Sequence, residues 1–461
     1  MRWNLVILSL LAAACGAVSV GLLGCGQGAA TSGPFAWSEH ARRVEPPAPV
    51  RVEPFELGTP DLVLLITGQN NGQMEICNCA GEAMPGGLSR RGGLFVSYRA
   101  AFGHTVALDM GDFTYIQPDD LRNDYLARAH ALLKYDAMAA GDQELGIGPP
   151  VLQRLIDDHR LPLFSTEASL KGLDIPASKT ISVGGRNVVV FSAMEEDSLR
   201  YMPRDARVAL VWREQTLAES LAAVAENDFV IVVAHGGEAL VNRVAAMGRV
   251  NLILRAHTGV SDPQIRLAAG VPVVKVGGSD FVGALAVRFP NGPRVTERDL
   301  ELRVESVDVR WPADARVFQV YEAFAHADMR RALDADKPEG LSYVPAATCG
   351  QCHATPYAGW RKTRHARAYK TLTDIRRAGD PNCLMCHTSG FGTTHGFTTI
   401  KQTLDLANVN CQNCHRFDLR SDGQGHVAPP AARPDEKICT SCHTPVTSPD
   451  FHFATMVKRV H

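Results

Sequence analysis

The chain has few aromatic residues, almost no net charge and, after its first 25 residues, no long apolar run. Aromatic residues make up 7% of its 461 residues, and 47 Lys and Arg nearly balance 49 Asp and Glu. The formal charge of −2 argues against nucleic-acid binding. With 45% hydrophobic and 21% charged residues, the composition excludes a disordered, collagen-like or polytopic membrane protein. At about 100–200 residues per domain, the length indicates two to four globular domains.

Cysteine is absent between Cys79 and Cys349, and eight of the 12 cysteines fall in the last quarter of the chain. Those eight form four Cys-x-x-Cys-His units: Cys349, Cys352 and His353; Cys383, Cys386 and His387; Cys411, Cys414 and His415; Cys439, Cys442 and His443. This is the attachment signature of c-type haem, in which the thiols add to the vinyl groups and the histidine becomes the proximal iron ligand. A single unit is also compatible with a zinc half-site or a redox dithiol. Four units within 95 residues predict four haem c groups and exclude an ordinary cytosolic enzyme.

Five further histidines of this region lie outside the units: His365, His395, His426, His452 and His461. Imidazole is the usual sixth ligand where a haem iron exchanges electrons with little structural change. Four of the five would complete bis-histidine coordination, and spacing does not show which one is left over. Each also has the ordinary alternative of a solvated or hydrogen-bonded histidine. We rank His365, His426 and His461 first as distal ligands, with His395 next.

The segment from Trp360 to Ala368, which contains His365, is not part of the haem motif. Together with Tyr343-Val344, the unit at Cys383 and the closing His461, it resembles the tetrahaem cytochrome c family that takes electrons from hydroxylamine oxidoreductase. The resemblance covers residues 341–461. It implies a haem-packed, mostly α or irregular domain, a redox protein partner, and distal roles for His365 and His426. Relatives commonly carry Gly-Pro-Gly after the third unit, where this chain has Arg416-Phe417-Asp418. Some members leave one haem five-coordinate, so a haem-based oxidoreductase acting on a small nitrogen or oxygen species is the alternative function.

The N-terminus predicts export. A short basic start precedes an apolar run from Leu5 to Leu23, and Leu22-Leu23-Gly24-Cys25 resembles the lipobox of bacterial lipoproteins. We therefore expect a signal peptide over residues 1–25, a lipid anchor at Cys25 on the periplasmic side of a bacterial membrane or cell envelope, and a flexible tether over 26–57. An uncleaved membrane anchor and simple secretion are the alternatives.

Between residues 58 and 310, short apolar runs alternate with amphipathic stretches. Strands are predicted at Leu62–Thr67, Thr105–Asp109, Leu161–Phe164, Val188–Ala193, Phe229–Ala234, Val250–Leu254 and Val271–Val276, with helices at Leu121–Ala140 and Gln215–Ala225. This alternation predicts an α/β layered domain. Phe281–Phe289 and Leu302–Val309 follow without an intervening helix and are expected to pair as an antiparallel edge. A helical linker is predicted over 311–340, centred on Ala313–Ala335, before the haem domain at 341–461.

The order of polar motifs in this α/β body resembles the 5′-nucleotidase branch of the calcineurin-like metallophosphoesterases. The motifs are Ile66 to Gly72, Gly111-Asp112, Gly141 to Glu144, Ala234-His235-Gly236 and Ala256-His257-Thr258-Gly259. In that family five motifs hold two metals that clamp a phosphate and its attacking hydroxide. The resemblance implies that the first metal site is lost, because Gln69, Asn71 and Gly259 replace its Asp and two His. It implies a second site at Asp112, Asp142, His235 and His257, all of which are able to bind a divalent metal.

Gln143 stands where the family has the histidine that assists the leaving group. A single metal does not perform the two-ion clamp, so the domain is predicted to lack hydrolase activity. Three alternatives stay open: a mononuclear metal site, a metal-free remnant, and an intact 5′-nucleotidase-like hydrolase.

Cys77 and Cys79 are the cysteines without a role in haem attachment or export. They are expected in a loop that reaches the strand-end rim of the metal residues. A redox-active pair, a soft-metal site, a plain disulfide and inert thiols are all compatible with this spacing. The following Gly86-Gly87 and Arg90-Arg91 predict either an anion-binding loop or a glycine-rich turn with solvated arginines.

Overall fold

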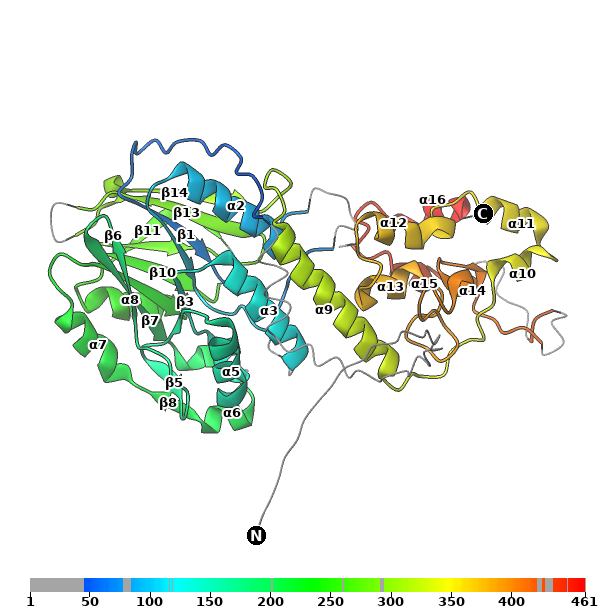
Figure 1. The fold of residues 1–461 in the computed structure, drawn as a ribbon, viewed down its shortest axis with the longest axis horizontal. Helices are drawn as coiled ribbons and strands as arrows, with labels where there is room; N and C mark the ends of the chain where they lie inside the picture. The colour runs from blue at the N-terminus through cyan, green and yellow to red at the C-terminus, as the bar shows by residue number, and fades with distance from the viewer. Residues whose placement is uncertain are drawn as a thin grey trace, which may run out of the picture.

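The computed structural model describes residues 45–77, 84–115, 117, 119–199, 202–258, 261–290, 294–420, 425–427, 434–445 and 447–460. Within them the chain forms an α/β domain and, on the other side of one long helix, a region of short helices and loops (Figure 1). The predicted fold class, an α/β layered domain followed by a mostly α or irregular domain, is therefore confirmed.

Two six-stranded sheets form the centre of the α/β domain. The strand orders are β14-β13-β1-β2-β3-β4 and β11-β12-β10-β9-β7-β6. The first sheet contains β1 (Leu62–Thr67), β2 (Thr105–Asp109), β3 (Ala137–Ala139), β4 (Leu163–Phe164), β13 (Phe281–Val287) and β14 (Leu300–Ser306). The second contains β6 (Lys179–Val183), β7 (Arg186–Met194), β9 (Phe229–His235), β10 (Leu252–Ala256), β11 (Asp262–Ala268) and β12 (Val271–Lys275), and β5 (Ala168–Leu170) pairs separately with β8 (Leu210–Trp212).

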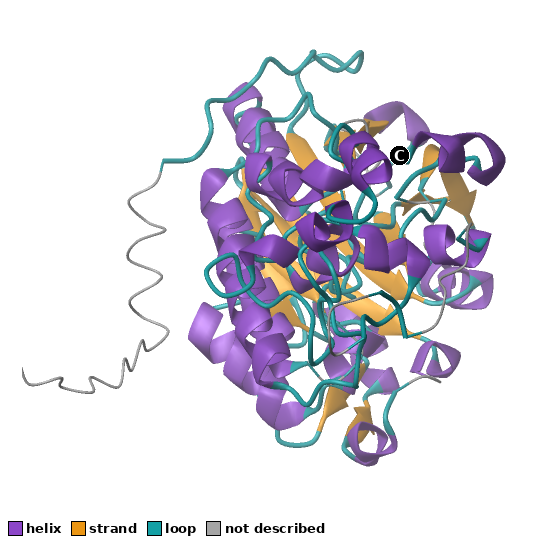
Figure 2. Cartoon of the chain, turned by 90° about the vertical axis from the view of Figure 1, so that its right-hand side faces the viewer, coloured by secondary structure: helices purple, strands orange, loops and turns teal. Residues whose placement is uncertain are grey.

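Side-chain alternation along the strands places the two sheets face to face. Leu62, Leu64 and Ile66 of β1 belong to one buried cluster with Val188 and Val190 of β7. The intervening Val63 and Leu65 point to the other face, where they join a cluster formed with the outer helices. The domain is therefore a four-layer sandwich with helices outside both sheets (Figure 2).

The helices cover these two outer faces. On the first sheet lie α2 (Leu88–Ala101), α3 (Asp120–Leu133), α5 (Pro149–His159) and α9 (Ala315–Asp334). On the second lie α7 (Glu214–Ala223) and α8 (Glu238–Ala246). The short α4 (Asp142–Gly146) and α6 (Arg204–Val208) and the 3-10 turns Glu196–Leu199 and Glu297–Asp299 complete the domain.

Helix α2 corrects one prediction, because the segment expected to be a glycine-rich loop or turn is helical from Leu88. Arg91 is not solvated but fully buried, and its guanidinium donates to Asn70 Oδ1 and to the Ser279 carbonyl. Glycine is needed inside this helix for packing, since a Cβ on Gly93 would lie 1.8 Å from the Pro312 carbonyl oxygen. The sequence pattern misled because that close approach involves a segment more than 200 residues away.

The predicted strands agree with the structure. The strands are found within a few residues of their predicted bounds, and β13 and β14 pair antiparallel at the sheet edge as expected. The helix predicted to reach Ala140 ends instead at Leu133, because Lys134 turns left-handed and Ala137–Ala139 forms β3. No helix among the described residues is long and apolar enough to cross a bilayer. The apolar run before Cys25 lies outside them.

Helix α9 connects the two parts of the chain and packs into both. Val317 and Phe324 belong to the core shared with α2 and α3, whereas Met329 lies in the small core of the C-terminal part with Leu372 and Leu384. The C-terminal part itself is built from short helices: α10 (Ala346–Gly350), α11 (Ala354–Trp360), α12 (Ala368–Asp374), α13 (Pro381–His387), α14 (Cys411–His415), α15 (Glu436–Thr440) and α16 (Phe453–Met456). Three-residue 3-10 turns lie at His365–Arg367, Leu404–Leu406 and Val457–Arg459.

Candidate functional site

The four Cys-x-x-Cys-His units line one large cavity in the C-terminal part. Its volume is about 2330 Å³, and all eight motif cysteines and all four motif histidines contribute to its wall. A pocket for one ordinary small ligand is about 300–1,000 Å³. The cavity therefore has room for several such groups, and its wall carries the donor set that covalent haem attachment requires.

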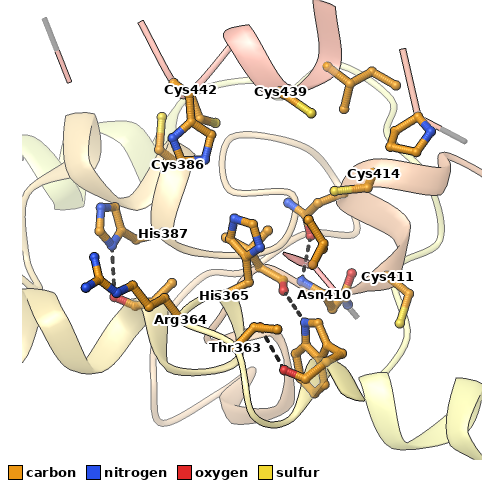
Figure 3. Close-up of a pocket in the computed structure, with 18 of the residues that line it drawn as sticks. Thr363, Arg364, His365, Cys386, His387, Asn410, Cys411, Cys414, Cys439 and Cys442 are labelled. Carbon is orange, nitrogen blue, oxygen red and sulfur yellow. Dashed lines mark hydrogen bonds between the residues drawn. The ribbon is translucent and has the colours of Figure 1, made fainter. Parts of the chain in front are cut away.

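Two further histidines line the same cavity, His365 and His426. The ring centres of His353 and His426 are 5.9 Å apart with nearly parallel planes, and those of His365 and His443 are 6.0 Å apart. Two imidazoles on opposite sides of one metal, each bonded at about 2 Å, have ring centres about 6 Å apart. Both pairs therefore have the spacing that two imidazoles would need to hold one iron between them. Figure 3 shows His365 inside the cavity with the thiols of other units around it.

Hydrogen bonds from the far ring nitrogen orient two motif histidines. His387 Nδ1 lies 2.8 Å from the Ala368 carbonyl oxygen, which only accepts, so this nitrogen carries the proton and Nε2 is left with a lone pair. His443 Nδ1 is 2.8 Å from Ser448 Oγ. Partners of this kind fix the tautomer and orientation of iron-ligating imidazoles.

The motif thiols are all free, and thiols of different units contact one another. Cys349 hydrogen-bonds Cys411, which lowers the pKa of Cys349 to about 7, and Cys442 hydrogen-bonds Cys386 with the same effect on the pKa of Cys442. Units one and three are thus neighbours, as are units two and four. Cys386 and Cys442 lie side by side in Figure 3.

The remaining histidines lie elsewhere. His395 hydrogen-bonds Glu339 at 3.0 Å with a half-exposed side chain, and neither it nor the exposed His452 is part of the cavity wall. His461 lies outside the described residues, as do Cys25 and Cys79.

The α/β domain brings together the four residues predicted for a metal. Asp112, Asp142, His235 and His257 follow or end β2, β3, β9 and β10, so they meet where the carboxyl ends of parallel strands of both sheets converge. One donor atom from each lies within 4.8 Å of the others. His257 Nδ1 is 3.5 Å from Asp112 Oδ2 and 3.3 Å from Asp142 Oδ1.

The electrostatics of this cluster suit a cation. Hydrogen bonds to Asp112 and Asp142 raise the pKa of His257 to about 10. Burial raises the pKa of Asp142, and although burial also acts on Asp112, the charges of His235 and His257 bring its pKa below the usual value. His235 Nε2 donates to the Met110 carbonyl at 2.9 Å, so Nδ1 is the ring nitrogen that a bound metal would take. That Nδ1 is buried without a hydrogen-bond partner and lies beside two carboxylates and a second imidazole, so the residues present fit a divalent metal.

Two neighbours hold the cluster in place. Glu144, which is fully buried, accepts hydrogen bonds from the backbone N–H groups of Asp112, Phe113, Thr114 and Gly141. Gly141 leaves space for the ligands, because a Cβ there would lie 2.2 Å from Asp112 Oδ1. Sequence reasoning placed both residues in the third motif without a separate role, since the contacts of both with Asp112 join positions about 30 residues apart.

Gln69 and Asn71, which the resemblance places at a first metal position, take part in amide hydrogen bonds. Gln69 Oε1 accepts from Thr258 N at 3.0 Å, and Gln143 Nε2 donates to Asn71 Oδ1 at 2.6 Å. Gln69, Asn71, Asp112 and His257 all adopt positive φ between 50° and 62°. Non-glycine residues with positive φ cluster at functional sites.

Cys77 is disulfide-bonded, in contrast to the eight motif cysteines, and it lines the haem-motif cavity together with Glu75. This excludes inert thiols among the alternatives for Cys77. Sequence reasoning did not predict that this loop reaches the C-terminal part of the chain.

These features define a c-type cytochrome region joined to a metallophosphoesterase-like α/β domain. The family model described as "Cytochrome c554 and c-prime" matches residues 348–416. The curated cytochrome c-554 of Nitrosomonas europaea is 25% identical in an alignment 152 residues long. The alignment covers 28% of this chain and 60% of that protein, so the chain spans less than two thirds of its relative. Both findings confirm the resemblance of the C-terminal region.

Solved structures confirm the fold of the α/β domain. A sulfate thiohydrolase SoxB from Thermus thermophilus, in complex with glycerol, superposes with a TM-score of 0.51 at 18% identity, covering 64% of each chain. A 5′-nucleotidase precursor, also from Thermus thermophilus, gives a TM-score of 0.50 at 19% identity, covering 65% of this chain and 68% of its own. At these identities the likeness concerns the fold alone.

Proposed function

We propose that the protein is an exported c-type cytochrome that binds four haems and transfers electrons. The observation that carries the proposal is the single cavity lined by all eight motif cysteines and all four motif histidines. Haem irons bound in this way exchange single electrons. Because the units share one cavity and their thiols contact pairwise, the bound groups would lie close enough to pass electrons in sequence to a redox protein partner.

The chain's residues divide into attachment and ligation roles. The cysteines of each unit would form thioethers, and His353, His387, His415 and His443 would be the proximal ligands. The ring spacings support His426 as the second ligand of the first unit and His365 as that of the fourth. Among the described histidines, no other lines the cavity to serve the second and third units. His461, ranked among the first distal ligands, lies outside the described residues. The alternative function is a haem-based oxidoreductase in which an open iron position would take a small nitrogen or oxygen species.

A haem count with reduced and oxidised spectra tests the proposal, and four haems per chain are expected. His426→Ala should convert one low-spin haem to a high-spin species that binds carbon monoxide, whereas the matched control His395→Ala should leave the spectrum unchanged. Fewer than four haems in wild-type protein would refute the central claim. Carbon monoxide binding by wild-type protein would favour the oxidoreductase alternative.

For the α/β domain we propose one divalent metal at Asp112, Asp142, His235 and His257, without hydrolase activity. The loss of the first site and of the leaving-group histidine supports this, because the two-ion clamp and the general acid are both missing. The names of the structural relatives suggest the substrates to test, namely 5′-nucleotides and sulfur compounds that carry a sulfate group. Hydrolysis of one of them that is lost in Asp112→Asn would establish the hydrolase alternative instead.

We also propose that the chain is exported and anchored through lipid on Cys25, with a signal peptide before it. Covalent haem attachment outside the cytoplasm agrees with that N-terminal pattern. Labelling with a radioactive fatty acid should mark wild-type protein and not Cys25→Ala. Equal labelling of both would refute the anchor.

A further inference from the structure

Within the described chain, the haem-motif cavity takes two wall residues from the α/β domain, Glu75 and Cys77. Met74 and Ile76, which alternate with them, are buried at 6% and 4% exposure, and Met74 belongs to the main core of the α/β domain. Gly87 allows this arrangement, because a Cβ there would lie 2.6 Å from Glu75 Oε2 at a φ of 96°. The loop thus places Met74 and Ile76 in the interior of the α/β domain, and Glu75 and Cys77 in the wall of the haem-motif cavity.

Buried contacts fix this loop to the second haem unit. Glu75 Oε2 faces Arg377 Nη2 at 3.9 Å, and both side chains are 6% exposed. The Arg377 guanidinium lies 4.9 Å from the ring centre of Tyr321, whose hydroxyl donates to Asp380 Oδ2 at 2.6 Å. Asp380 is the N-cap of α13, the helix that carries Cys383, Cys386 and His387. The position of Cys77 relative to the second unit is therefore held by a continuous buried network.

We propose that the disulfide holding Cys77 is a redox centre that exchanges electrons with the haems of this cavity. The inference rests on the proposed function, since it requires bound haem. It makes the disulfide of Cys77 a redox partner, within the same chain, of the haems proposed for residues 341–461. The observations behind it are the oxidised state of Cys77, its place in the cavity wall and the fixed docking of its loop on the second unit.

The electron balance is simple. Breaking the disulfide consumes two electrons, one from each of two ferrous haems, and two protons, giving two thiols and two ferric haems. Glu75 lies two residues from Cys77 on the same wall. Burial raises the pKa of Glu75 against the opposing effects of Ser89, Arg377 and Arg90, so this carboxyl retains a proton at higher pH than an exposed glutamate. The two protons would come from solvent or from groups of the cavity wall such as Glu75.

Anaerobic coulometric titration of the full-length holoprotein tests the inference, with the haem count measured on the same sample. Wild-type protein should take up two electrons more than its number of haems, and Cys77→Ser should take up a number equal to its haems. Alkylation after acid quenching, read by peptide mass spectrometry, should mark Cys77 in reduced wild-type protein and not in oxidised protein. The same map identifies the other cysteine of the disulfide.

Kinetics add a second readout. After a brief pulse reduces the haems alone, the haem absorbance of wild-type protein should decay at a rate independent of protein concentration while the label at Cys77 appears. Arg377→Met should slow that decay and keep the excess of two electrons. The inference would be overturned if wild-type protein took up only as many electrons as it has haems, or if Cys77→Ser still took up two electrons more than its haems. Neither result would contradict the proposed electron transfer by the haems. A low haem count would count against the proposed function alone, because the excess is scored against the haems present.

Discussion

Replacing Gly141 by alanine tests the geometry of the metal cluster. The added Cβ would lie 2.2 Å from Asp112 Oδ1 and 2.8 Å from His235 Cε1. Ordinary contacts of carbon lie at about 3.5–4.0 Å, so the Asp112 carboxylate must retreat by about 1 Å. The φ of −90° and ψ of −175° of Gly141 are angles that alanine also adopts, so the cost comes from contacts, which include one of 2.9 Å to the Asp112 backbone nitrogen.

The displacement is large for a metal ligand, since metal–ligand distances tolerate only about 0.2 Å. We therefore expect Gly141→Ala to weaken binding of Mn²⁺ or Zn²⁺ by at least about 10–100-fold, the usual effect of disturbing the support of a metal ligand. The crowding should also cost about 1–3 kcal/mol of the free energy of unfolding. Isothermal titration calorimetry measures the first effect and thermal unfolding the second.

Gly103→Ala is the matched control, because no atom lies within 4 Å of a Cβ at that position. It should bind metal and unfold like wild-type protein. Circular dichroism shows whether Gly141→Ala is folded. A folded Gly141→Ala protein whose metal Kd stays within twofold of the wild-type value would refute the interpretation of this cluster as a metal site crowded against Gly141.

Three further outcomes are expected. Tyr321→Phe removes the hydroxyl that donates to Asp380, which should lower the free energy of unfolding by about 1–3 kcal/mol in denaturant titration; an unchanged midpoint would contradict the buried bond. Partial burial acts to raise the pKa of Asp119, but hydrogen bonds from Arg331 outweigh burial, and the net pKa is lowered. The pair should therefore stabilise the fold above about pH 4, and this stabilisation should be lost as the pH falls through the lowered pKa. Asp119→Asn should flatten that part of the stability profile, and an unaltered profile would exclude this contribution. His395→Ala should leave the haem reduction potentials unchanged, because His395 bonds Glu339 away from the cavity wall, and a shifted potential would restore it as a ligand.

Local patterns were enough to predict most of the α/β framework. Leu62–Thr67 and Thr105–Asp109 are apolar runs buried between layers, so composition alone marks them as strands with the bounds observed. The same patterns failed at α2, where glycines inside a helix are explained only by the approach of Pro312 and Asp314. Propensity indicates a break at such glycines, and tertiary packing overrides it.

At the candidate sites, too, local motifs were predictable and contacts between distant segments were not. Motif spacing predicts which cysteines and histidines would attach haem, and the family resemblance predicts the four residues that the fold gathers around one point. The pairing of His353 with His426 and of His443 with His365 depends on chain reversals that spacing does not encode. The Glu75–Arg377 pair joins residues about 300 positions apart, and neither lies in a recognisable motif.

Helix α9 joins the two parts of the chain that the proposed electron exchange requires to stay together. Its first half contributes Val317 and Phe324 to the core of the α/β domain, and Met329 near its end packs in the core of the haem region. Between these, Tyr321 bonds the cap of the second haem unit. A flexible tether would let the distance between Cys77 and the haem units vary, and electron exchange falls steeply with distance. A helix shared by two hydrophobic cores would hold that separation constant, as the proposed electron exchange requires.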